Sequence, residues 1–133
     1  MKQIINTILS FLGTSCIYLF GKFDIALQCF LVAVVLDYIT GVLNAGYNKR
    51  LSSKIGLKGI LKKLALLCLI ALAVVIDKIT SADGIVRTLI IYYLVANEGL
   101  SIVENLAEMN IIIPEFIKEK LEQLKKGGEK HES

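Results

Sequence analysis

The stretch IALQCFLVAVVLDYITGVL, residues 25–43, decides the fold class. Only three polar side chains interrupt these nineteen residues, namely Gln28, Asp37 and Thr40. A helix needs about 20 mostly apolar residues to cross the roughly 30 Å of hydrocarbon in a bilayer. The length and composition of this stretch therefore predict a helix that spans a membrane.

Three further segments have a similar character. Residues 60–79 contain the apolar run 64–76, and Lys62 and Lys63 at its start could snorkel their ammonium groups into the headgroups. Residues 85–106 begin apolar and turn polar at Asn97. Residues 4–20 carry several small polar side chains, so they could span or lie in the interface as an amphipathic helix, and we expect them to span. In a chain that is 55% hydrophobic, these segments predict an all-α integral membrane bundle of about four transmembrane helices, or three if the first lies in the interface.

The composition changes near residue 110, which divides the chain into a membrane domain, residues 1–109, and a charged tail, residues 110–133. In the tail, Pro114 suits the first turn of a helix, and Ile117, Leu121 and Leu124 would share one face. Gly127 and the glycine after it should end this pattern. We therefore predict a short cytoplasmic C-terminal helix.

The basic residues predict the orientation, because Lys and Arg collect in the cytoplasmic loops of membrane proteins. The tail is rich in lysine, whereas the two other connections are short and mixed in charge. We therefore expect both termini, and the connection between the second and third apolar segments, to face the cytoplasm. That connection, between residues 44 and 63, has no acidic residue and six basic ones: Lys49, Arg50, Lys54, Lys58, Lys62 and Lys63.

Catalytic and metal-binding patterns are absent from the sequence. The one histidine, His131, lies in the tail, and the three cysteines, Cys16, Cys29 and Cys68, lie in apolar runs without a C-x-x-C spacing. We predict a protein that is not an enzyme and has no metal or cofactor. Nucleic acid is not an expected partner, because membrane topology already explains the basic connection.

Polar residues inside the apolar segments are the candidate functional residues, since a charge at the bilayer centre costs about 2.5–3.5 kcal/mol or more. In the fourth segment they form one helical stripe, which could face a water-filled lumen or partner helices, or from Glu104 onward mark the helix leaving the membrane. In the second segment, Gly41 and Ala45 form a small-x-x-x-small pair that permits close helix approach, either between copies or within one chain. The candidates for a pore or an oligomer interface are Asp37, Thr40, Gly41, Asn44, Asn97, Glu98, Ser101, Glu104 and Asn105.

Two runs resemble the phage holin family that includes the clostridial toxin-release holins. They are LDYITGVLNAGYNKRLSSKIGLKGILKK, residues 36–63, and NEGLSIVENLAEMNIIIPEFIKEKLEQLK, residues 97–125. The elements that carry the resemblance are D-x-x-T-G from Asp37, S-S-x-x-G-x-x-G-I from Ser52 and N-E-x-x-S-I-x-E-N from Asn97.

The resemblance implies a protein that accumulates in the bacterial cell membrane, forms homo-oligomers and opens lesions through which an endolysin or a toxin leaves the cytoplasm. It implies as partners other copies of the chain and a bilayer with anionic headgroups, and it allows an antiholin as a further partner. No direct contact with the released protein is required. Two alternatives stay open at this point: an antiholin-like regulator, and a subunit of a small channel or transporter.

Overall fold

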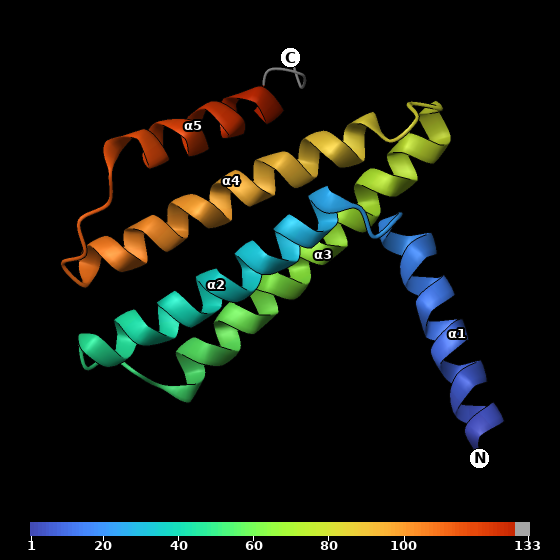
Figure 1. Cartoon of the computed structure of the whole chain (residues 1–133), viewed down its shortest axis with the longest axis horizontal. Helices are drawn as coiled ribbons and strands as arrows, with labels where there is room; N and C mark the ends of the chain where they lie inside the picture. The colour runs from blue at the N-terminus through green and yellow to red at the C-terminus, as the bar shows by residue number, and fades with distance from the viewer. Residues whose placement is uncertain (130–133) are drawn as a thin grey trace.

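The computed structural model describes residues 1–129, and all regular secondary structure in this range is helical. The helices are α1 (Lys2–Phe20), α2 (Ile25–Tyr47), α3 (Ser53–Thr80), α4 (Ile85–Glu108) and α5 (Glu115–Glu129) (Figure 1). Each of the first four is long and apolar enough to cross a membrane. The predicted all-α bundle of membrane-spanning helices with a short C-terminal helix is therefore confirmed.

The helices are longer than the predicted spans at the end that holds the basic connection. α2 continues to Tyr47 and α3 already begins at Ser53, so only residues 48–52 join them. The Ser52 hydroxyl starts α3 by accepting a hydrogen bond from the Ile55 N–H, as helix N-caps do. Hydropathy marks the part of a helix that suits hydrocarbon, and polar turns beyond that part are helical without being apolar.

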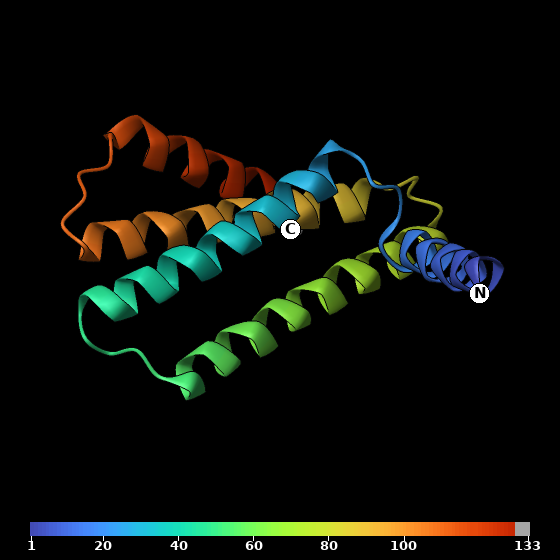
Figure 2. The same ribbon diagram turned by 60° about the horizontal axis from the view of Figure 1, so that its bottom comes forward.

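The core of the bundle lies between α2, α3 and α4. Phe30, Ile70 and Ile91, one from each of these helices, are fully buried at its centre. α4 packs against α2, α3 and α5, whereas α2 and α3 approach each other only over a short stretch (Figure 2). The fourth helix is thus the element that the other helices of the bundle share.

α1 lies apart from this core. It points away from the bundle, packs mainly against α3, and meets α4 through its last residue, Phe20 (Figure 1). None of its residues is buried, and large apolar side chains such as Ile4, Phe11 and Tyr18 are exposed. Such a surface is suited to lipid or to another apolar helix.

Arg87 near the start of α4 holds the connection between α1 and α2. Its Nε donates to the carbonyl oxygen of Phe20 at 2.6 Å, and its Nη1 donates to Asp24 Oδ2 at 2.8 Å. A Cβ atom at Gly21 would lie 2.6 Å from the Arg87 Nε, and Gly21 has a φ of 81°, so glycine is required there on both counts. Asp77 of α3 completes this end by accepting hydrogen bonds from the Val86 and Arg87 N–H groups.

α5 folds back along α4 (Figure 1). The predicted apolar face packs in part, because Leu121 and Leu124 are half-buried and Leu121 packs over Gly99 of α4, whereas Ile117 is exposed. Lys125 Nζ lies 5.8 Å from the centre of the Tyr93 ring. The prediction that the glycines at 127 and 128 end the helix is wrong, since α5 continues to Glu129. The last residues, which include His131, lie outside the described part of the chain.

Candidate functional site

A charged cluster lies between the three bundle helices. Lys63 Nζ of α3 donates hydrogen bonds to Asp37 Oδ2 of α2 and to Glu98 Oε2 of α4. The side chains of these residues are only 14%, 10% and 3% exposed, respectively. Two carboxylates and one ammonium group therefore share a buried position, and the trio carries one net negative charge when all three groups are ionised.

This cluster explains how charged residues can be buried among apolar helices. Isolated charges among apolar helices are costly, and ion pairs with good hydrogen bonds offset that cost. Asp37 needed a partner or water, and the structure supplies Lys63 from the same chain. The expectation that Lys63 snorkels into the headgroups is therefore wrong, because its amine points between α2 and α4 instead.

A hydrogen-bonded network continues from the cluster toward the connection between α2 and α3. The Asn105 amide of α4 donates to Asp37 Oδ1 at 3.1 Å and to the Thr40 hydroxyl at 3.0 Å. Gly41 lies beside the same amide, where a Cβ atom would come within 3.7 Å of its nitrogen. The small and polar residues of α2 thus allow α4 to pack close to α2.

A separate hydrogen-bonded group surrounds Glu108, the last residue of α4. Its carboxylate accepts hydrogen bonds from the Asn44 amide and from Arg50 Nη2, the latter at 3.1 Å. Arg50 remains 60% exposed, so this outer ion pair is solvated and contributes little to stability. The polar groups between the helices are therefore buried at the charged cluster and exposed to solvent near Glu108.

The predicted candidates separate into two groups in the structure. Asp37, Thr40, Glu98 and Asn105 belong to the network, Asn44 belongs to the group around Glu108, and Gly41 and Ser101 lie beside them in a shared cavity wall. Glu104 is exposed, and Asn97 is half-buried. Within one chain, α4 therefore turns most of its polar stripe toward α2 and α3.

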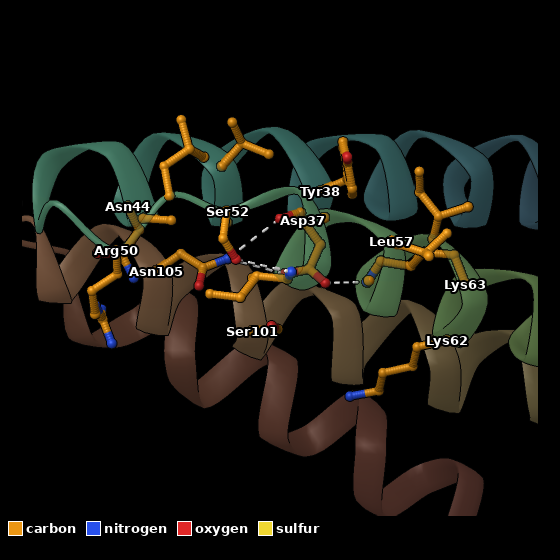
Figure 3. A pocket seen from close by; sticks show the side chains of 18 of the residues that line it. Asp37, Tyr38, Asn44, Arg50, Ser52, Leu57, Lys62, Lys63, Ser101 and Asn105 are labelled. Carbon is orange, nitrogen blue, oxygen red and sulfur yellow. Dashed lines mark hydrogen bonds and ion pairs between the residues drawn. The ribbon is translucent and has the colours of Figure 1, made fainter.

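The basic connection is largely helical. Lys54, Lys58, Lys62 and Lys63 lie on the first turns of α3, and only Lys49 and Arg50 lie between the helices. Of these six residues, Lys63 alone is not exposed. Figure 3 shows Arg50, Lys62 and Lys63 around one cavity, with the amine of Lys62 pointing away from Asp37.

Sequence reasoning missed Lys63 as the central cation and Arg87 as a buried clamp. A signal for Lys63 was present, because two acids in separate apolar segments require a cation from a third. Arg87 gave no such signal, since its side chain divides its hydrogen bonds between backbone carbonyls and the Asp24 carboxylate of a distant connection. Its hydrogen bonds to Asp24 hold the pKa of that carboxyl below its ordinary value.

The chemistry open to this arrangement is the exchange of ion pairs and hydrogen bonds. Within residues 1–129, no group of three or more His, Cys, Asp or Glu residues is placed to hold a metal ion. The cluster can open only if water or other polar groups replace the contacts of Lys63.

Comparison with known proteins agrees with this architecture. Residues 14–126 match the model of the bacteriophage holin family. An uncharacterized 14.9 kDa protein of Clostridium perfringens is 43% identical over 128 residues, which cover 93% of this chain and 97% of that protein. An uncharacterized protein of Listeria monocytogenes is 44% identical over 101 residues, or 76% of this chain and 72% of its own.

One of the relatives is a phage protein whose name states a function. The probable holin of Bacillus phage phi105 is 36% identical over 104 residues, which cover 78% of this chain and 76% of the phage protein. No solved structure matches. The family model covers most of the chain, including the helices that carry the charged cluster, and so the chain belongs to the bacteriophage holin family.

Proposed function

We propose that the protein is a holin that self-associates in the bacterial cytoplasmic membrane and opens lesions through which an endolysin or a toxin leaves the cytoplasm. The observation that carries the proposal is the cluster of Asp37, Lys63 and Glu98, which places three ionisable groups inside helices that are otherwise suited to lipid. In a single chain the groups satisfy one another. In an assembly, water in a lumen can take over that role.

The exposed apolar surface supports the self-association step. α1 buries none of its residues, and the outer faces of α2 and α3 expose side chains such as Val35 and Leu72. Lipid can cover these faces while copies accumulate, and other copies can cover them in an assembly. No catalytic group takes part in the proposed mechanism, which is permeabilisation alone.

The test is induced expression in bacterial cells that contain an endolysin, with membrane potential, potassium efflux and lysis followed over time. We expect the wild-type chain to collapse the potential abruptly, after which lysis requires the endolysin. Glu98→Leu keeps a balanced pair of Lys63 and Asp37, so the variant should insert and accumulate yet permeabilise late or not at all. Glu104→Leu is the matched control, because it removes the same charge from an exposed position on α4.

Each other outcome points to a different conclusion. Accumulation of the wild-type chain with an intact membrane potential contradicts the holin and favours an antiholin-like regulator. Ion flux without passage of the endolysin favours a channel or transporter subunit. If Glu98→Leu and Glu104→Leu both lyse on the wild-type schedule, the buried cluster takes no part in the lesion.

A further inference from the structure

A cavity of about 740 Å³ opens between the second half of α2 and the first half of α3, with α4 as its floor (Figure 3). It exists because α2 and α3 approach each other only over a short stretch. Tyr38 spaces the two helices, since its hydroxyl and ring lie 3.3 Å and 3.6 Å from where the Cβ atoms of Gly56 and Gly59 would be. The Tyr38 side chain thus keeps α2 and α3 apart, and the space beside it stays open.

The walls and the rim of this cavity differ in chemistry. Val42 and Ala45 of α2 face Ile55 and Ile60 of α3, which gives an apolar slot between the helices. Arg50 and Lys62 also line the cavity, and both are exposed. Arg50 gives one hydrogen bond to Glu108 and still has a side chain that is 60% exposed, which leaves further guanidinium N–H groups free to bind an anion.

The charge balance around the cavity favours a negatively charged ligand. Three cations and two acids line it: Asp37 contacts Lys63, Glu108 contacts Arg50 and Asn44, and Lys62 makes no ion pair within residues 1–129. Lys54 and Lys58 do not line it, so the cations available to a ligand in the cavity are Arg50 and Lys62. An apolar slot with a cationic rim matches a molecule that has a hydrocarbon chain and an anionic head.

We propose that this cavity binds an anionic glycerophospholipid of the cytoplasmic leaflet, with an acyl chain between α2 and α3 and the phosphate on Arg50 and Lys62. The inference rests on the orientation that belongs to the proposed function, which places residues 48–52 at the cytoplasmic surface. Arginine suits this role, because its planar fork can donate two parallel hydrogen bonds to one phosphate. A second copy of the chain, inserted as an apolar helix, would make no use of these cations.

The experiment measures lipid binding to the purified full-length protein in detergent by native mass spectrometry. Dioleoyl phosphatidylglycerol is titrated, with dioleoyl phosphatidylcholine as the lipid of equal chains and no net charge. We expect tighter binding of phosphatidylglycerol, and binding about tenfold weaker or more in the double variant Arg50→Gln, Lys62→Gln. The matched control is Lys54→Gln, Lys58→Gln, which removes the same charge from residues that do not line the cavity.

A third variant tests the slot without changing any charge. Val42→Trp fills the space between α2 and α3, so phosphatidylglycerol binding should fall although every cation remains. Circular dichroism checks that each variant keeps its helical content. Equal losses in the two double variants, equal binding of the two lipids, or unchanged binding by Val42→Trp would each overturn the proposal.

Failure of this proposal is distinct from failure of the holin proposal. Lipid binding is measured on isolated protein and needs no permeabilisation. A chain that lyses cells but binds both lipids equally is a holin without this site. A chain that binds phosphatidylglycerol selectively and leaves the membrane potential intact has the site but a different activity.

Discussion

Lys63 separates two carboxylates that would otherwise repel each other inside the bundle. Removing one partner from a buried ion pair typically costs roughly 3–5 kcal/mol, because the remaining charge is left uncompensated. We expect Lys63→Met to lower the midpoint of thermal unfolding, followed by circular dichroism in dodecyl maltoside. Lys62→Met is the matched control, because Lys62 is the exposed neighbour of Lys63 on the same helix.

The same cluster allows a rescue experiment. Asp37→Asn and Glu98→Gln, added to Lys63→Met, remove the remaining charges while they keep the side chains similar in size. Uncharged groups are less costly to bury, so most of the lost stability should return. Equal unfolding midpoints for Lys63→Met and Lys62→Met would mean that the cluster contributes nothing to the stability of the fold.

Asp24 gives the molecule a pH dependence at the opposite end of the bundle. Arg87 lowers the pKa of this carboxyl from its ordinary value of 3.8, so its ionised form stabilises the fold above that pH. This contribution is lost as the pH falls through the lowered pKa of the folded state. Asp24→Asn should unfold at a lower temperature than the wild type at pH 7, and the difference should shrink toward pH 3.

Asparagine is the appropriate replacement, because it can still cap α2 through the hydrogen bond that the Leu27 N–H gives to the side chain at residue 24. The measured change then reports on the charge and not on the cap. A difference in unfolding temperature that stays constant from pH 7 to pH 3 would show that the Arg87 pair has no linked protonation.

At the scale of the helices, the docking of α5 depends on a glycine. A Cβ atom at Gly99 would lie 2.6 Å from a methyl group of Leu121, which a flexible leucine can relieve for alanine but not for a large side chain. We expect Gly99→Leu to release α5 from α4. The lysines of α5, such as Lys118 and Lys120, should then be cut faster by trypsin in detergent than in the wild type.

The control for this experiment is Gly46→Leu, since Gly46 is also helical and nothing lies within 4 Å of its Cβ position. Protein with Gly46→Leu should be cut at the wild-type rate. If Gly99→Leu is also cut at that rate, α5 does not depend on its contact with α4 for protection.

At the scale of the whole molecule, the connection between α2 and α3 gathers basic residues without an acid at one end of the bundle. The connection between α2 and α3 and the end of α4 lie at the end of the bundle opposite to the Arg87 clamp (Figure 1). Because basic residues mark the cytoplasmic side, we expect single cysteines at Ser53 and Ser133 to resist an impermeant thiol reagent in intact cells. The three native cysteines are removed for this test, and Ser81→Cys should be labelled from outside.

Lysis of the cells supplies the control for the topology, since all three introduced cysteines should then react. Labelling at Ser53 or Ser133 before lysis would reverse the orientation. It would also place the cavity beside Arg50 in the outer leaflet, where the lipid proposed for it would have to be sought.

The apolar runs by themselves predicted the order of the first four helices and their capacity to cross a membrane. These are local properties, because an uninterrupted stretch such as residues 25–43 has few alternatives to a spanning helix. The motifs from Asp37, Ser52 and Asn97 also indicated the family, which the comparison with known proteins confirmed. Helix ends were less well predicted, because the capping by Ser52 and the polar turns of α3 do not depend on hydropathy.

Only the tertiary structure decided which polar groups meet. Asp37, Lys63 and Glu98 are far apart in the sequence, and their contact depends on how α2, α3 and α4 pack side by side. The same packing turned Lys63 inward from the predicted headgroup position, left Glu104 exposed, and brought α5 back over Gly99. The sequence shows which face of each helix is polar. Which residues that face contacts depends on the burial and the charges of the neighbouring helices, and these are defined only once the bundle has assembled.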